Sequence, residues 1–328
     1  MPTLKTVDGL DALILVDNST DNLSSVRAFV ATEFSSLGRR RSGSYILAGG
    51  CLCVAAHGLS CLMTIRLGAE SRTLLFDAGP EDHIFEQNVS RTGADLGAVE
   101  AIVLSHGHWD HSEGMRRALQ IIRDRNGGRR VPYYAHPDMF RVRAIRLPNG
   151  DLLRTEDVPG VDELTAIGAD VVNTTEAQDL FDGMAFVSGE VPRVTAYEKG
   201  VPGHHRRTLD GKAWEPDELI IDERFVAVHV RDKGLVVFSA CSHAGVVNIL
   251  THAANCCPGV PLHAVVGGLH LAGGNEKIIP ETVEALRRFN LEVIAAGHCT
   301  GWRAMTALAG AFGGDRLSPL SVGKRLTF

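Results

Sequence analysis

Short apolar segments, many of them rich in Val, Ile and Leu, alternate with segments of helical periodicity along the chain. This alternation, without an internal repeat, indicates an α/β or mixed layered fold. The predicted strands are residues 12–16, 45–56, 61–67, 73–77, 101–104, 131–135, 184–187, 225–230, 235–240, 262–266 and 291–295, and helices are predicted to begin near Ser112, Gly245, Pro280 and Gly301.

Two stretches interrupt the pattern. Residues 147–183 and 190–216 show little periodicity, and Gly, Pro, His and Arg concentrate in the second of them. Loops of this length in a compact domain are usually functional or disordered. We therefore predict a single domain over residues 1–328, with an insertion or lid over the active site at 147–216.

The composition argues against two classes of partner. The 328 residues include 33 Lys and Arg against 39 Asp and Glu, a net charge of −6, so no broad basic surface is expected for a nucleic-acid backbone. No apolar stretch reaches the ~20 residues that a membrane span needs. We expect a cytoplasmic protein whose seven cysteines are reduced thiols. The sequence leaves a homodimer open.

One segment carries the pattern of a metal site. His106, His108, Asp110 and His111 follow the predicted strand 101–104 directly. An extended backbone points alternate side chains the same way, so His106 and His108 are expected to bind one metal ion. Asp110 and His111 begin the next turn and are expected to face a second ion. Instead of binding metal, the segment could be a polar run that caps a helix at Ser112. That alternative gives the three imidazoles no role.

Further ligands are expected at later strand ends. Cys241 and His243 follow the strand 235–240, His270 follows 262–266, and His298 follows 291–295. A lone histidine after an apolar strand is more often a core or cap residue, but three in matching positions favour the metal. The predicted metal ligands are His106, His108, Asp110, His111, Cys241, His243 and His298, and the predicted catalytic residues are Asp110 and His270. Asp77, also at a strand end, is expected to orient a histidine.

These segments resemble the motifs of the metallo-β-lactamase superfamily. Leu75-Phe-Asp-Ala-Gly looks like the first motif, Ser105-His-Gly-His-Trp-Asp-His like the second, and His298 like the final histidine. The resemblance implies a four-layer αββα sandwich with a one- or two-metal site along its edge. More narrowly, Ala240-Cys-Ser-His-Ala-Gly and Gly297-His-Cys-Thr-Gly are similar to a subgroup named for 7,8-dihydropterin-6-methyl-4-(β-D-ribofuranosyl)aminobenzene-5′-phosphate synthase.

The chain departs from the superfamily pattern in two places. Glu190 stands where a third-motif histidine is expected, and Cys241 or His243 takes the place of a bridging aspartate. Occupancy by one metal and an unusual second site both stay open. Imidazole-rich ligation with a carboxylate suits Zn²⁺, as one or two ions, and Fe or Mn would also be accepted.

The predicted function is hydrolysis of a small anionic substrate of phosphate or ester type by a metal-activated water. Asp110 would hold the water and accept a proton. Arg193, Arg206 and Arg207, with Glu190, would contact the substrate, unless the arginines belong to a solvated loop. Two alternatives remain: a methanopterin-type pterin C–N synthase that releases pyrophosphate, and a non-catalytic metal-bound sensor whose coordination is closed by protein ligands.

Overall fold

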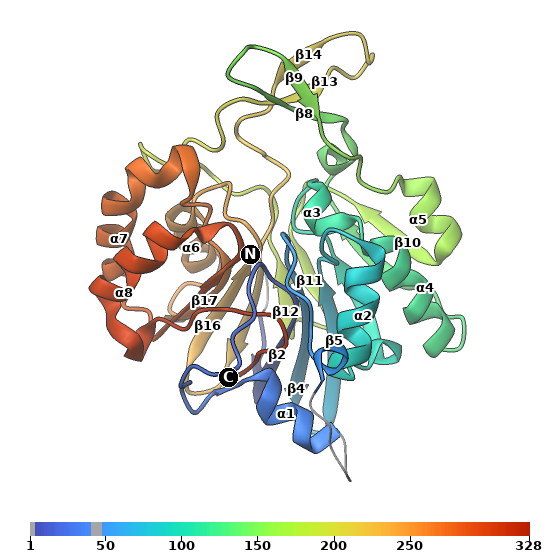
Figure 1. The fold of residues 1–328 in the computed structure, drawn as a ribbon, viewed down its shortest axis with the longest axis vertical. Helices are drawn as coiled ribbons and strands as arrows, with labels where there is room; N and C mark the ends of the chain where they lie inside the picture. Colours follow the sequence, from blue (N-terminus) through green and yellow to red (C-terminus); the bar gives the residue numbers. More distant parts are fainter. Residues whose placement is uncertain (1–3, 41–47) are drawn as a thin grey trace.

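The computed structural model describes residues 4–40 and 48–328 and contains two large β-sheets that pack face to face (Figure 1). The first sheet has the order β10 (Ala169–Asn173), β7 (Val131–Ala135), β6 (Val99–Val103), β5 (Glu70–Phe76), β4 (Ser60–Leu67), β2 (Gly9–Val16), β19 (Arg325–Thr327) and β3 (Val30–Ala31). The second has the order β11 (Gln178–Leu180), β12 (Ala185–Val187), β15 (Val226–Val230), β16 (Gly234–Ser239), β17 (Leu262–Gly268) and β18 (Val293–Gly297), with β1 (Thr6–Val7) paired to β15.

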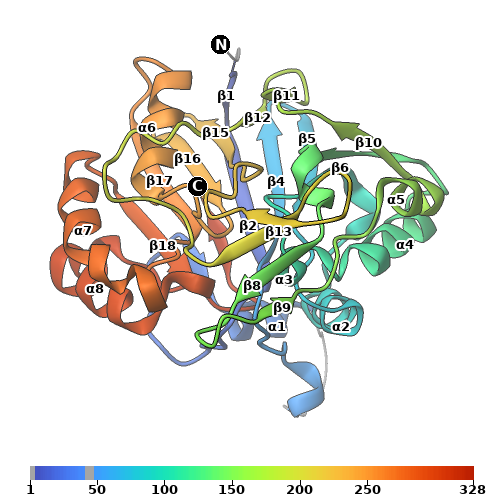
Figure 2. The same cartoon turned by 90° about the horizontal axis from the view of Figure 1, so that it is seen from above.

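Helices cover the outer face of each sheet, so the molecule has four layers (Figure 2). The first sheet is covered by α2 (Asp82–Thr92), α4 (Met115–Arg125) and α5 (Val161–Ile167), and the second by α6 (Val246–Cys256), α7 (Ile279–Arg288) and α8 (Trp302–Arg316). Shorter helices are α1 (Glu33–Arg40), α3 (Trp109–Ser112), and the 3₁₀ turns η1 (Gly49–Cys51), η2 (Leu96–Ala98), η3 (Pro137–Phe140), η4 (Gly273–Ile278) and η5 (His298–Thr300). The predicted α/β class and αββα sandwich are confirmed.

Alternate residues of each central strand enter different cores. In β5, Leu74 and Phe76 join the core between the two sheets, whereas Leu75 joins the core under α2 and α4. Residues 236–238 of β16 alternate in the same way between the central core and the core under α6. Because these strands are buried on both faces, they appear in the sequence as continuous apolar runs.

The chain places the ends of five strands at one edge of the sandwich. Strands β5 and β6 are parallel, as are β16, β17 and β18, and the carboxyl ends of parallel strands meet at the same edge of a sheet. The loops that follow these five strands, here called the strand-end loops, carry the predicted metal ligands as well as Asp77 and His270. They come from both sheets and lie below a small third sheet in Figure 1.

The small sheet has the order β14 (Trp214–Pro216), β13 (His204–Arg207), β8 (Arg143–Arg146) and β9 (Leu152–Arg154). The predicted bounds of the insertion, 147–216, are therefore wrong, since α5, β10, β11 and β12 within this range belong to the main layers. Strand β10 lies at the edge of its sheet and β11 is short, so neither shows an extended apolar pattern, whereas β12 coincides with the predicted strand 184–187. That the small sheet acts as a lid stays a prediction.

The predicted strand 45–56 is also wrong where it can be compared. Residues 45–47 lie outside the described residues, and residues 48–56 form η1 and an extended loop. Side chains bind the loop's backbone in place of a neighbouring strand: Cys53 N donates to Glu33 Oε1 at 2.7 Å and Val54 N to Asn88 Oδ1 at 2.8 Å. In the described parts of the chain, no helix has the length and apolar character needed to cross a bilayer.

Candidate metal centre

The loop after β6 is held in shape at Gly107. Its N–H donates to Asp222 Oδ2 at 2.8 Å, and its carbonyl accepts from Arg143 Nη1 at 2.8 Å. A Cβ at this position would lie 2.1 Å from Arg143 Nη1 and 2.4 Å from the carbonyl oxygen of Met139, so only glycine fits. The loop therefore presents His106 and His108 from the two sides of a fixed glycine.

Three imidazoles converge at what we call the first position, those of His106 and His243 buried and that of His108 half-buried. His106 Nε2 lies 3.0 Å from His108 Nδ1 and 3.0 Å from His243 Nε2. Burial, followed by the charges of neighbouring histidines, lowers the pKa of each of these residues well below its ordinary value. The rings are therefore neutral at pH 7, and each offers one nitrogen lone pair, which is the ligand that transition metals take from histidine.

A carboxylate and two imidazoles form a second position. Asp110 Oδ2 lies 3.6 Å from His111 Nε2 and 3.5 Å from His298 Nε2, and the two Nε2 atoms are 3.2 Å apart. Cys241 Sγ lies 3.6 Å from His111 Nε2 and groups with residues of both positions. The sandwich thus brings together all the predicted ligands, although they come from three separate loops.

Hydrogen bonds behind the rings fix which nitrogen faces the second position. His111 Nδ1 lies 2.7 Å from Asp77 Oδ2, and His298 Nδ1 lies 3.0 Å from Asn18 Oδ1. Both oxygens are acceptors, so each Nδ1 carries a hydrogen and each Nε2 of a neutral ring presents its lone pair. Asp77 also accepts from Ser105 N at 2.7 Å, and thus orients both a histidine and its loop, as expected from the sequence.

The electrostatics of the second position favour a cation. Burial alone would lower the pKa of His111, but the carboxylates of Asp110 and Asp77 outweigh it and raise the pKa to about 9. Positive charge at this point is therefore stabilised, whether a proton on His111 or a metal ion carries it. Two converging nitrogen lone pairs beside two carboxylates fit a divalent cation.

Both positions open into a cavity of about 460 Å³. Its walls combine imidazoles with apolar groups, and within residues 4–40 and 48–328 no Lys or Arg lines it. His57 and Trp109 lie on one side, and His204 reaches in from the small sheet with its ring 5.0 Å from that of His108. The other lining residues are Asn18, His108, Asp110, Ile145, Thr155, Cys241, His243, His270, Ala272, His298, Cys299 and Gly301.

Comparisons with known proteins agree with this architecture. Residues 72–177 match the sequence model of the β-lactamase superfamily domain. A crystal structure described as a metal-dependent hydrolase of the β-lactamase superfamily superposes with a TM-score of 0.69 at 20% identity, covering 97% of this chain and 98% of that one. This chain has the metallo-β-lactamase fold.

Two curated proteins of Methanocaldococcus jannaschii are also similar to the chain. One, named 7,8-dihydropterin-6-methyl-4-(β-D-ribofuranosyl)-aminobenzene-5′-phosphate synthase, is 26% identical over 275 residues, which is 83% of this chain and 90% of that protein. The other, of uncharacterized function, is 28% identical over 263 residues, 78% of this chain and 88% of that protein. The resemblance to the metallo-β-lactamase superfamily and to this subgroup is confirmed.

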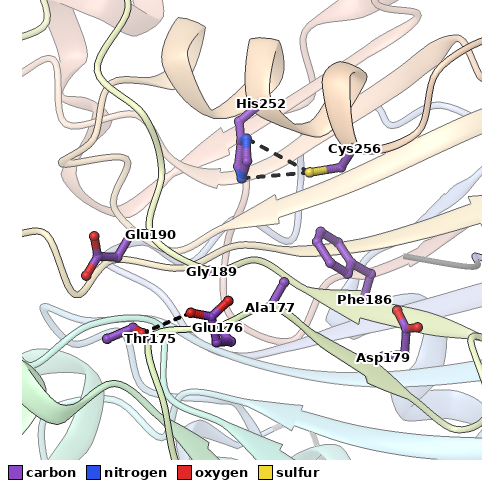
Figure 3. Close-up of a pocket in the computed structure, with 9 residues that line it drawn as sticks. All are labelled: Thr175, Glu176, Ala177, Asp179, Phe186, Gly189, Glu190, His252 and Cys256. Atoms are coloured by element: carbon purple, nitrogen blue, oxygen red, sulfur yellow. Dashed lines mark hydrogen bonds between the residues drawn. The ribbon is translucent and has the colours of Figure 1, made fainter. Parts of the chain in front are cut away.

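Within the metallo-β-lactamase fold, His243 supplies the third imidazole of the first position. The sequence comparison had placed Glu190 at that point of the motif. Glu190 instead lies 3.1 Å from His136 Nε2 and lines a separate pocket with Thr175, Glu176 and His252 (Figure 3). The structure therefore places Glu190 outside the lining of the metal cavity, and its contact with a substrate stays a prediction.

The three predicted substrate-binding arginines also lie outside the cavity. Arg193 donates to the backbone carbonyls of Val191, Leu219 and Ile220. Arg206 is paired with Asp138, Glu215 and Asp217. The Arg207 guanidinium stacks 4.2 Å above the Trp214 ring and lines a groove on the small sheet. These arginines hold together the small sheet and its neighbouring loop, so the structure gives them no contact with a substrate at the metal positions.

Three titratable residues that line the cavity were not predicted from the sequence. His57 belongs to the motif Ala56-His-Gly-Leu-Ser, but no neighbouring ligand signals its proximity to Asp110. His204 lies on the same strand, β13, as Arg206 and Arg207, and the sequence analysis assigned substrate binding to these charged residues instead. Cys299 directly follows His298, and its single thiol at a strand end has the same pattern as a buried core cysteine.

Proposed function

We propose that this protein is a metal-dependent hydrolase that acts on a small substrate held in the 460 Å³ cavity. The observation that carries the proposal is the convergence of His106, His108 and His243 beside Asp110, His111 and His298, with both groups open to that cavity. A purely structural metal site would be enclosed by protein ligands. The open side supports catalysis over the sensor alternative.

The residues fit one metal ion at each position. His106, His108 and His243 would hold the first ion, and Asp110, His111 and His298 the second, with Cys241 within reach of both. Such ions supply Lewis acidity and a nucleophile from water at neutral pH. Nitrogen, oxygen and sulfur ligands together suit Zn²⁺, and Fe or Mn would be accepted less well because sulfur is a soft ligand.

Asp110 and His57 form a route for the proton that hydrolysis releases. Asp110 Oδ2 lies 3.4 Å from His57 Nε2, and the His57 side chain is 58% exposed. Asn18 Nδ2 lies 3.1 Å from His57 Nδ1 and holds the ring in place. Asp110 would accept the proton inside the cavity, and His57 would pass it to solvent.

His270 would act on the other side of the substrate. Its ring is 4.3 Å from that of His243, and its Nδ1 has no hydrogen-bond partner among the described residues. An imidazole in this place would donate a proton to the leaving group. Among the described residues, no arginine or lysine lines the cavity. An anionic group of the substrate would therefore face the metal positions, and the remainder would contact imidazole and apolar side chains.

Metal removal and a substrate panel test the proposal. The purified protein would be stripped with a chelator, reconstituted with Zn²⁺, Mn²⁺ or Fe²⁺, and assayed on nitrophenyl carboxylic esters, phosphomonoesters, phosphodiesters and lactones. We expect one or two ions per chain and hydrolysis of one class that is lost on stripping and restored by metal. Full activity without metal would refute the mechanism.

The pterin synthase relative supports a second candidate function. The similarity extends over 83% of this chain and 90% of the relative. In this alternative the metal ions would offset the charge of a diphosphate leaving group during C–N bond formation. Pyrophosphate release from a pterin diphosphate only when an arylamine is present would favour the synthase, whereas release without the amine would favour the hydrolase.

A further inference from the structure

Two thiols lie side by side in the wall of the metal cavity. Cys241 Sγ is 3.1 Å from Cys299 Sγ, and Cys299 Sγ is 3.4 Å from the Cys241 carbonyl oxygen. Both residues line the cavity, and both are free cysteines. The mechanism above uses one of them as a ligand and assigns nothing to the other.

Cys299 reaches the same point as residues of the second position. Its Sγ, Cys241 Sγ and a ring nitrogen of His298 all lie within 4.8 Å of one another. Cys241 in turn groups with His106 and His111. A single ion beside His298 is therefore within reach of both sulfur atoms.

The backbone of β17 leaves room for this arrangement. A Cβ at Gly268 would lie 2.6 Å from Cys299 Sγ and 3.2 Å from His298 Cδ2. Any larger residue there would push the thiol and the imidazole away from the cavity. The absence of a side chain at Gly268 thus allows the His298 ring and the Cys299 thiol to lie side by side at the cavity.

We propose that Cys241 and Cys299 together supply sulfur ligands to the second metal position, beside His298. The inference rests on the proposed metal site but not on the reaction assigned to it, since the first position would still hold its ion on three imidazoles and keep a side open to the cavity. Each thiol that binds releases its proton to solvent, and no oxidation is involved. Soft sulfur donors favour Zn²⁺ over Mn²⁺ or Mg²⁺, so this pair would make the position selective for zinc.

Cobalt substitution measures the number of sulfur ligands directly. In the Co²⁺ protein, thiolate ligands give charge-transfer absorption in the near ultraviolet. We expect Cys299→Ser and Cys241→Ser each to lose a large part of this absorption, and the double variant to lose all of it. Cys256→Ser is the matched control, because Cys256 lies beside His252 in the separate pocket of Figure 3.

Alkylation of the unmodified protein gives a readout that needs no variant. Metal-bound sulfur is a poor nucleophile, so Zn²⁺ should slow the modification of Cys299 by iodoacetamide at least about tenfold relative to the stripped protein. The rate at Cys256 should not change. Mass spectrometry of the peptides would report each site separately.

The outcomes separate this inference from the proposed function. If the protein binds metal and hydrolyses a substrate while the cobalt spectrum and alkylation are independent of Cys299, the inference is wrong and the hydrolase stands. A Cys241–Cys299 disulfide in fully metal-loaded protein would also overturn it. If the wild-type protein takes up no metal, the proposed function itself fails.

Discussion

The strand-end loops and the small sheet face each other across the cavity, but they are built differently. In the strand-end loops, most imidazoles and carboxylates are buried and hydrogen-bonded from behind, and a Cβ at Gly107 or Gly268 would meet neighbouring atoms. In the small sheet, polar groups pair with one another, and His204, Ile145 and Thr155 reach the cavity. On the proposed function, this difference assigns the chemistry to the strand-end loops and the selection of substrates to the small sheet.

The strongest test of this contrast is His106→Ala. Removal of the imidazole that contacts both His108 and His243 should abolish binding at the first position and lower kcat/KM by about a thousandfold or more, because residues that act as a unit lose their effect together. Elemental analysis and circular dichroism would check that metal, and not the fold, is lost. Wild-type turnover in this variant would show that the loops do not set the chemistry.

A smaller effect is expected for Asp77→Asn. The amide keeps the shape of the carboxylate but weakens its bond to His111 Nδ1, now 2.7 Å long. Loss of such an orienting partner lowers metal affinity by about 10- to 100-fold. The side-chain oxygen of Asn can still accept from Ser105 N, which holds the loop, so metal titration should show most of the loss at the second position. Equal loss at both positions would mean that Asp77 acts mainly on the loop and not on His111.

Gly107→Ala tests the fixed loop. The new methyl group would meet Arg143 and Met139, and we expect a loss of stability of about 1–3 kcal/mol from overpacking. Gly310→Ala is the matched control, because a Cβ there meets nothing within 4 Å and an alanine inside α8 should stabilise the helix by about 0.5–1 kcal/mol. Thermal denaturation of the two variants would measure the contrast.

The smallest effects should come from the small sheet. His204→Ala should raise KM several-fold with little change in kcat, since its ring lines the cavity without contacting the second position. Arg207→Ala removes only a cation–π contact with Trp214, worth about 0.5–1 kcal/mol, and should leave KM unchanged. A larger rise in KM for the Arg207 variant than for the His204 variant would reverse the assignment.

The layers and the ligands could be predicted because both follow from local patterns. Strands buried on both faces appear as apolar runs, and the histidines stand where those runs end. Most of the predicted central strands are present, β7 with the same bounds as predicted. Helix α2 was missed because its buried residues, among them Phe85 and Val89, are sparse among polar ones.

The surroundings of the site could not be predicted in the same way. The arginines of β13 have the composition of a substrate-binding loop, but their partners Asp138, Glu215 and Trp214 come from other segments. Likewise, Asn18 and His57 reach the second position from loops with no metal-binding pattern. The pairing of a polar side chain depends on residues that are distant in the sequence. The residues around it in the chain therefore do not reveal its partner.

Each metal position takes its ligands from both halves of the sandwich. His106, His108, Asp110 and His111 follow a strand of the first sheet, whereas His243 and His298 follow strands of the second. An ion bound at either position would therefore link the two halves. At a free metal concentration of one hundred times Kd, binding would raise the free energy of unfolding by about 2.7 kcal/mol. The concentration of metal in the cell would then affect the lifetime of the folded protein as well as its rate of turnover.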